Sequence, residues 1–212
     1  HRDFSAALEH TFSVLDAAVL VISATDPQHP YSEQIFHHLR KEQIPTIIFI
    51  NKMDIGPYSH REYMEMISRL VKAPCVDFNQ ASNKREEELA LCSDALLETY
   101  LEKGTITTDE IAAAISRLEV IPVFFGSARE QVGIRELLDA FSELITPPTY
   151  GSTFAARVYK ISHDESGQRW THLKITGGEL AVKQRIKTEK VDQIRRYHGS
   201  TYENCSHLPA GY

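Results

Sequence analysis

The first 146 residues alternate between short unbroken apolar runs and longer segments in which apolar residues recur every three or four positions. The runs lie at residues 17–24, Ile47–Ile50 and Val120–Phe125, and each is followed by a turn sequence. Short runs rich in β-branched and aromatic residues are typical of strands buried on both faces of a parallel sheet. Because strands and helical segments alternate at this spacing, we predict an α/β fold with a right-handed sheet.

The segments around these runs carry the helical period. The predicted helices are Asp3–Leu15, Ser32–Gln43, Ser59–Val71, Glu86–Glu102, Asp109–Leu118 and a last one from Gly133 to Leu144. We expect Ser32 and Thr108 to cap the second and fifth of these helices. Residues 73–84 show little periodicity, and we predict only a short strand at Cys75–Phe78 there.

The pattern changes behind a proline-rich connector. Alternating runs such as Phe154–Ile161, with turn signals at Ser166-Gly167 and Gly177-Gly178, predict short antiparallel strands. We therefore expect a second domain that is a β-barrel, partial within this sequence. The predicted organisation is a first domain over 1–146, a linker over 147–152 and the barrel domain over 153–212.

Composition excludes several classes of protein. The sequence is 42% hydrophobic and 25% charged, which is ordinary for a globular protein. Its three cysteines are far apart without a Cys-x-x-Cys pair, which argues against a zinc site or a disulfide framework and favours a reducing cytoplasm. The sequence shows no signal peptide and no apolar run of the ~18 residues that a membrane span needs. We expect a cytoplasmic monomer without membrane contact.

Charge is unevenly distributed along the chain. Residues 1–151 hold 13 Lys+Arg against 23 Asp+Glu, whereas residues 152–212 hold 10 against 6. The positive second part is better suited to a polyanionic partner. Chance variation in solvated surface charge explains the asymmetry equally well.

The candidate chemistry follows the run Ile47–Ile50, where the sequence continues Asn51-Lys52-Met53-Asp54. In parallel sheets, ligands bind beyond the carboxyl ends of the strands. A carboxylate such as Asp54 can accept both the ring N1–H and the amino group of guanine, a donor pair that adenine lacks. The stem of Lys52 can cover the flat base, and the amide of Asn51 can tie neighbouring loops together. The alternative is an ordinary strand-to-helix turn, in which Asn and Asp are common.

Together with Gly126-Ser127-Ala128 and a β-domain after a proline-rich joint, this motif resembles the translational GTPases. The opening His1-Arg2-Asp3-Phe4 is similar to the end of their Asp-Thr-Pro-Gly-His-x-Asp-Phe segment. Within that superfamily the chain most resembles the tetracycline-resistance ribosomal protection proteins, relatives of elongation factor G. Supporting stretches are Phe12–Asp16, Phe36–Lys41, Leu96–Tyr100, Val158–Ile161 and Gly167–Arg169.

The resemblance implies a fold and a set of roles. The fold is a P-loop GTPase-type three-layer α/β/α domain, partial here, followed by a partial β-barrel. Asp54 would recognise guanine, Lys52 would stack on it and Asn51 would brace the loop. The Ala128 N–H, helped by Ser127, would donate to the guanine oxygen. His1 would orient the attacking water in GTP hydrolysis; the alternative is that His1 is only a terminal residue or a tag remnant.

The resemblance also implies partners and missing parts. The ribosome would be the partner, with residues 153–212 contacting the small subunit and its rRNA. GTP or GDP would be the nucleotide, but the sequence has no Gly-x-x-x-x-Gly-Lys-[Ser/Thr] phosphate loop, so this loop and the Mg²⁺ ligands are expected upstream. No metal ligand is assigned within the chain. We therefore expect the parent protein to be a GTPase, and the segment alone to bind nucleotide weakly or not at all.

Smaller departures concern hydrolysis. Ala17 stands where the family usually has Gly, residues 26–31 replace a loop that normally faces the second switch, and Arg2 replaces an apolar residue. Three functions stay open from sequence alone. The first is a tetracycline-protection GTPase, the second is an elongation factor G-like or release-factor-recycling GTPase, and the third is a ribosome-binding module without catalysis.

Overall fold

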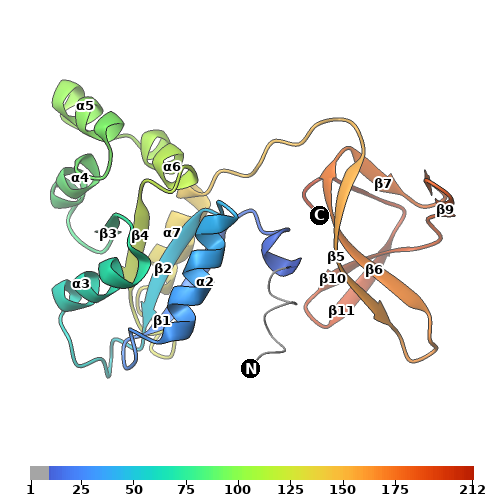
Figure 1. The fold of residues 1–212 in the computed structure, drawn as a ribbon, viewed down its shortest axis with the longest axis horizontal. Coiled ribbons are helices and arrows are strands. Elements are labelled where there is room, and N and C mark those ends of the chain that lie inside the picture. Colours follow the sequence, from blue (N-terminus) through green and yellow to red (C-terminus); the bar gives the residue numbers. More distant parts are fainter. Residues whose placement is uncertain (1–9) are drawn as a thin grey trace. The chain divides into compact units, whose positions relative to one another are not determined.

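The computed structural model describes residues 10–212, which divide into two compact units (Figure 1). The first unit is Leu15–Pro147, and the second consists of Pro148–Tyr212 together with residues 10–14. His1 and most of the predicted helix Asp3–Leu15 lie outside the described residues. Of that helix, residues 10–12 are helical in the structure.

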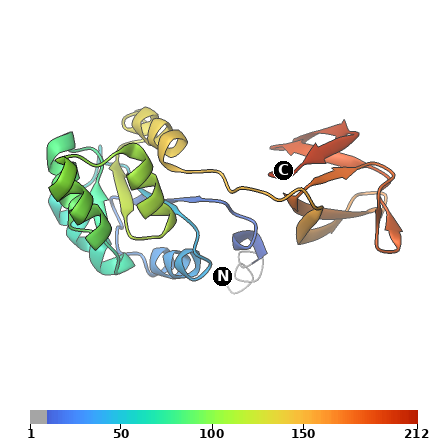
Figure 2. The ribbon, with the colours of Figure 1, turned by 90° about the horizontal axis from the view of Figure 1, so that it is seen from above.

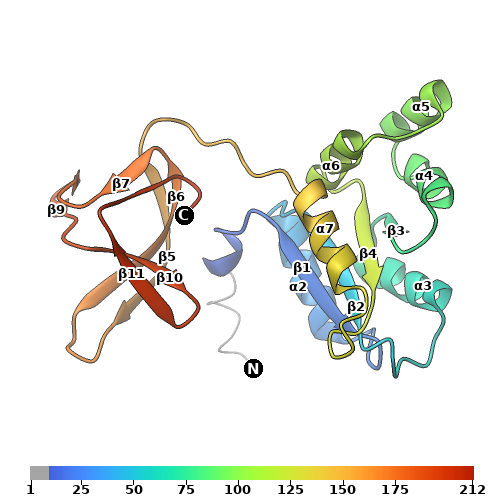
Figure 3. The same cartoon turned by 180° about the vertical axis from the view of Figure 1, so that it is seen from behind.

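The first unit is built on a parallel sheet of four strands, which confirms the predicted α/β fold. Its strands are β1 (Ala18–Ser23), β2 (Thr46–Asn51), β3 (Cys75–Asp77) and β4 (Ile121–Phe125), in the order β1-β2-β4-β3. The helices that connect and cover them are α2 (Pro30–Lys41), α3 (His60–Val71), α4 (Ser82–Ala90), α5 (Asp94–Lys103), α6 (Thr108–Ser116) and α7 (Ile134–Leu144). Figure 3 shows the same sheet from behind, with α7 in front of it.

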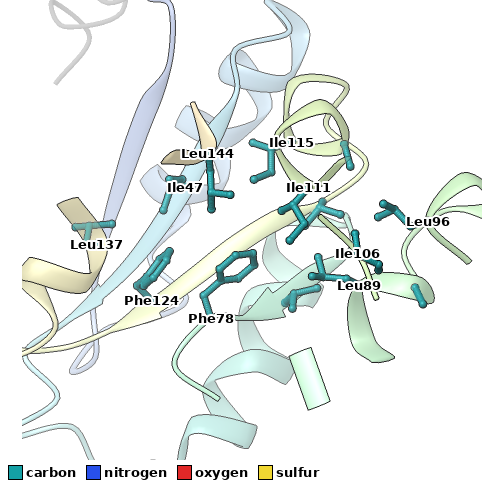
Figure 4. Packing of buried hydrophobic residues seen from close by; sticks show 14 of the residues in the cluster. Ile47, Phe78, Leu89, Leu96, Ile106, Ile111, Ile115, Phe124, Leu137 and Leu144 are labelled. Carbon is teal, nitrogen blue, oxygen red and sulfur yellow. The ribbon is translucent and has the colours of Figure 1, made fainter. Parts of the chain in front are cut away.

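The unbroken apolar runs contribute side chains to two cores, one on each face of the sheet. Along β2, Ile47 and Phe49 belong to the core that α6 and α7 cover, whereas Ile48 and Ile50 belong to the core that α2 and α3 cover. Figure 2 shows α7 (yellow) and α2 (blue) on opposite sides of the strands. Figure 4 shows the first core, in which side chains from β2 and β4 meet residues of α6 and α7. Burial on both faces explains why these strands lack polar alternation.

The helix starts follow local capping chemistry, which corrects three predictions. Helix α2 begins at Pro30 with His29 as its N-cap, not at Ser32, because Pro is well suited to the first helical position. Helix α6 is capped by Thr107 in a capping box with Glu110, not by Thr108. The single helix predicted over Glu86–Glu102 is wrong, because the chain breaks after α4 and Ser93 caps the new helix α5.

The remaining predicted elements of the first unit are confirmed. Ser59 is the N-cap of α3, and its hydroxyl shares a capping box with Glu62. Gly133 precedes α7 with φ of 76°, the left-handed conformation that favours glycine. The short strand predicted in the irregular region is β3, at the edge of the sheet.

The second unit contains antiparallel strands, as predicted. Its strands are β5 (Ala155–His163), β6 (Arg169–Gly177), β7 (Glu179–Ala181), β8 (Arg185–Ile186), β9 (Glu189–Lys190), β10 (Ile194–His198), β11 (Thr201–Cys205) and β12 (His207–Pro209). They pair as four two-stranded ladders, β5-β6, β7-β12, β8-β9 and β10-β11. Ile175, Leu180 and Ile194 form the centre of a small core.

Candidate functional site

The two motif loops lie side by side at the carboxyl edge of the sheet, because β2 and β4 are neighbouring strands. Ile50 at the end of β2 is paired with Phe125 at the end of β4. The Gly126 N–H donates to the Ile50 carbonyl at 3.0 Å, and the Met53 N–H donates to the Gly126 carbonyl at 3.0 Å. The backbone of the Asn51–Asp54 loop is thus fastened directly to that of the Gly126–Ala128 loop.

The side chain of Asn51 adds a second connection between these loops. Its Oδ1 accepts from the Lys52 N–H at 2.8 Å and from the Ala128 N–H at 2.9 Å. One amide oxygen therefore closes the turn that it belongs to and holds a residue 77 positions away. The Ala128 N–H, predicted to donate to guanine, already has a protein acceptor, so a ligand oxygen would share this donor in a three-centre bond.

Lys52 and Asp54 project from a tight turn. Lys52 has φ of 69°, an uncommon left-handed conformation for a residue with a side chain, and its carbonyl accepts from the Ile55 N–H at 3.2 Å. Such conformations cluster at ligand-binding sites. Lys52 and Asp54 are both exposed. Within residues 10–212 the Asp54 carboxylate makes no hydrogen bond or ion pair, so both of its oxygens are open to a ligand.

Ser127 shapes the second loop from inside. The residue is only 2% exposed, and its Oγ accepts from the Glu130 N–H at 3.4 Å. Its backbone pairs with that of Val132 in both directions at 3.0 Å. A Cβ on Gly126 would lie 2.2 Å from the Val132 carbonyl oxygen, so this turn has no room for any other residue. Ser127 therefore holds the loop in place, and Ala128 is the residue that the loop exposes.

A third loop, which the sequence did not lead us to expect, lies at the same edge. Asn79, two residues beyond the end of β3, accepts the Phe125 N–H at its Oδ1 with a distance of 2.8 Å. The only sequence signal was the Asp77-x-Asn79 spacing after a short strand, which is typical of an Asx turn. In the structure, Asp77 Oδ1 accepts from the Asn79 N–H at 2.8 Å.

Other predictions concern catalysis, metal binding, the cysteines and the membrane. The predicted catalytic residue His1 lies outside the described residues. Within the described part of the chain, no group of three or more His, Cys, Asp or Glu side chains could hold a metal ion. The three cysteines are free, and burial raises the pKa of Cys75 to about 12 and that of Cys92 to about 11. No helix in residues 10–212 has both the length and the apolar character for crossing a membrane.

The first unit is a parallel sheet covered on both faces, and an Asn-Lys-x-Asp turn is joined to a Gly-Ser-Ala turn at the carboxyl edge of this sheet. This combination defines a GTPase-type α/β domain. The family model described as the elongation factor Tu GTP binding domain matches residues 1–147. The chain belongs to this family, and membership implies that the domain binds guanine nucleotide.

Several relatives of the chain carry the name tetracycline resistance protein. The chain is 29% identical over 204 residues to the tetracycline resistance protein TetW of Butyrivibrio fibrisolvens, covering 88% of this chain and 32% of that protein. It is 30% identical over 213 residues to TetO of Streptococcus pneumoniae, covering 92% and 33%. It is 29% identical over 218 residues to TetM of Ureaplasma urealyticum, covering 92% and 33%. The chain thus spans about a third of the length of these relatives.

A solved structure shares the fold. The crystal structure of ttk003000868 from Thermus thermophilus superposes with a TM-score of 0.80 at 18% identity. The match covers 100% of this chain and 40% of that one. At this level of identity the likeness concerns the fold alone.

Proposed function

We propose that this chain is the guanine-recognising part of a GTPase that acts on the ribosome and confers tetracycline resistance by ribosomal protection. The names of the relatives support this branch over an elongation factor G-like or release-factor-recycling role, since TetW, TetS, TetO and TetM are all called tetracycline resistance proteins. Membership in a GTP binding family argues against a binding module without catalysis.

The observation that carries the proposal is the Asn51 bridge, which holds the Asp54 turn beside Ala128. With the two loops fixed in this way, the free Asp54 carboxylate accepts the N1–H and the amino group of guanine. The Ala128 N–H donates to the guanine 6-oxo group while it stays in contact with Asn51. The exposed stem of Lys52 covers one face of the base.

The other functional groups that we propose lie outside this edge of the sheet. His1 orients the water that attacks the γ-phosphate, and the phosphate loop and Mg²⁺ ligands lie upstream of His1. We propose a GTP-binding domain over 1–146 and a linker over 147–152. Residues 153–212 form part of a β-barrel that contacts the rRNA of the small subunit. The protein works as a cytoplasmic monomer.

The strand pairs of the second unit support the barrel. The β7–β12 and β5–β6 pairs are joined by a further backbone bond, since the Gly211 N–H, two residues beyond β12, donates to the carbonyl of Ile175 in β6 at 2.9 Å. Its excess of basic residues, 10 Lys+Arg against 6 Asp+Glu over 152–212, suits a phosphate-rich partner.

The substitution Asp54→Asn in the full-length protein tests the proposal. Loss of the paired acceptor costs about 3 kcal/mol, or roughly 100-fold in the Kd for GDP. Preference shifts towards xanthosine diphosphate, whose 2-oxo group accepts from the new amide. Calorimetric titration with both nucleotides measures the shift, and Asp192→Asn, an exposed position in the second unit, serves as the matched control.

The same variants in a tetracycline-susceptible host connect nucleotide binding to the activity. We expect the unsubstituted protein and Asp192→Asn to support growth on tetracycline, and Asp54→Asn to support much less. Failure of the unsubstituted protein to protect the host would reject the ribosomal protection role. An unchanged nucleotide preference in Asp54→Asn would show that the turn is only structural.

A further inference from the structure

Strand β4 extends beyond β3 at the carboxyl edge of the sheet, and this leaves a backbone donor without a neighbouring strand. The last register pair of the two strands is Asp77 with Val123, and the Phe78 N–H then donates to the Val123 carbonyl at 2.9 Å. Because alternate residues of a parallel strand bond to the same neighbour, the next donor of β4 on this side belongs to Phe125. Asn79 Oδ1 accepts this N–H at 2.8 Å. A side chain thus completes β4 where the neighbouring strand has ended.

Asn79 is itself held by Asp77, which connects the third loop to helix α3. Asp77 Oδ1 accepts from the Asn79 N–H at 2.8 Å, and Asp77 Oδ2 lies 3.5 Å from His60 Nδ1. The Asp77 side chain is 13% exposed, so water competes little for its oxygens. The His60 ring stacks on Phe125, with ring centroids 4.1 Å apart and an interplanar angle of 14°. These four residues, His60, Asp77, Asn79 and Phe125, form a closed ring of contacts that we call the Asp77 ring.

The Asp77 ring borders both loops of the candidate site. Phe125 directly precedes the loop Gly126–Ala128, and His60 is the first residue of α3, the helix that follows the Asn51–Asp54 loop. On the other side of β4, the Gly126 N–H donates to the Ile50 carbonyl at 3.0 Å. The residues where β4 ends are therefore held from both sides, by β2 on one and by Asn79 on the other. A shift of Phe125 would be passed to Ala128, three residues further along the chain.

We propose that Asn79, fixed by Asp77, is a positioning residue for guanine recognition. It acts through Phe125 and sets where the Ala128 N–H points relative to Asp54. The inference rests on the proposed function, because it assigns a role to Asn79 only if these two loops recognise guanine. It adds a third loop, from the edge strand β3, to the two loops that carry the motif.

The experiment compares GDP with 6-thioguanosine diphosphate as ligands of the full-length protein and its Asn79→Ala variant. The thio analogue keeps both donors that Asp54 accepts, but replaces the 6-oxo group with sulfur, a weak acceptor. Loss of the Asn79 bond should raise the Kd for GDP about three- to tenfold. The Kd for the thio analogue should change much less, so the preference for GDP over the analogue should fall. A variant that merely destabilised the domain would weaken both ligands equally.

Three further variants make the result decisive. Asn79→Asp keeps an oxygen acceptor and should retain the preference of the unsubstituted protein. Asn79→Ser keeps a polar side chain in the exposed turn, but this side chain is too short to reach the Phe125 N–H. The Ser variant should therefore behave like Asn79→Ala, and it takes the place of Asn79→Ala if the Ala variant does not fold. Asn83→Ala, an exposed position on α4, is the matched control and should change nothing.

The outcomes separate the two proposals. If the unsubstituted protein does not prefer GDP over ADP, the proposed function fails. If it does, but Asn79→Ala or Asn79→Ser keeps the full preference for GDP over the thio analogue, the positioning role is overturned. An equal loss for both ligands overturns it as well.

Discussion

Replacing Asn51 with alanine tests whether the bridge between the two loops is what prepares the site for a nucleotide. The substitution removes the one oxygen that accepts from both the Lys52 and the Ala128 N–H groups, at 2.8 and 2.9 Å. It leaves the backbone bonds between the loops intact, because Gly126 still bonds to Ile50 and Met53 still bonds to Gly126. We therefore expect the loops to stay adjacent but to lose their fixed geometry.

The size of the expected loss in GDP affinity follows from the exposure of Lys52 and Ala128. Lys52 and Ala128 are exposed, so water can replace the lost acceptor, and each bond contributes about 1 kcal/mol. Two bonds give about 2 kcal/mol, which corresponds to roughly a 30-fold rise in the Kd for GDP. Because the unliganded protein makes the same two bonds, global stability should fall by about the same amount, and the unchanged buried side chains of β2 and β4 should keep the domain folded.

Calorimetric titration of the full-length protein measures the Kd for GDP, and urea unfolding measures the global stability. Asn83→Ala is again the matched control, since it makes the same substitution at an exposed position on α4. A Kd within twofold of the unsubstituted protein would refute the reasoning, because it would mean that the backbone bonds alone fix the loops. A variant that is unfolded without urea would also refute it, because the backbone bonds and the buried cores are expected to keep the domain folded.

Two further predictions concern stability. In Tyr63→Phe, the buried hydroxyl that donates to the Ala24 carbonyl at 2.9 Å is lost, so unfolding by guanidinium should show a loss of about 1–2 kcal/mol, and an unchanged midpoint would contradict this role. The pKa of Glu110 is lowered to about 2, first by the hydrogen bond from Lys103 and then by those from Thr107. A lowered pKa stabilises the fold above the unfolded value of about 4.5 and loses this effect as pH falls towards 2. Glu110→Gln should therefore unfold at lower urea than the unsubstituted protein at pH 7 and at the same urea near pH 2; a constant difference would oppose this.

The sheet of the first unit could be predicted because its physical requirement is visible in single residues. Ile47 to Ile50 alternate between two cores, so every position along β2 has to be apolar. A one-sided strand does not impose that demand, and a helix buried all round would need a longer apolar run. The sequence Asn51-Lys52-Met53-Asp54 could be recognised as a candidate site in the same way, because one carboxylate beside a strand end suits a donor pair whatever the rest of the fold.

Helix boundaries were less predictable, since several residues compete for each cap. Ser32 and Thr108 are good N-cap residues, but Pro30 and the Thr107–Glu110 pair stabilise helix starts slightly earlier. The break between α4 and α5 depends on Ser93, whose Oγ accepts from the Leu96 N–H at 3.4 Å. Because apolar residues recur at helical spacing on both sides of Ser93, the sequence pattern alone does not reveal that the helix ends there.

The role that we assign to Asn79 could not be predicted from the sequence, because it depends on the order and relative length of the strands. An asparagine in an irregular segment has no distinctive chemistry, and its contact with Phe125 spans 46 positions. That contact exists only because β3 stops at Asp77 while β4, its neighbour in the sheet, continues. Strand order and relative strand length therefore decide which side chain holds the end of β4. Residues that would contact the ligand can be recognised by their chemistry, whereas a residue that positions them is recognised only once the topology shows which strand lacks a neighbour.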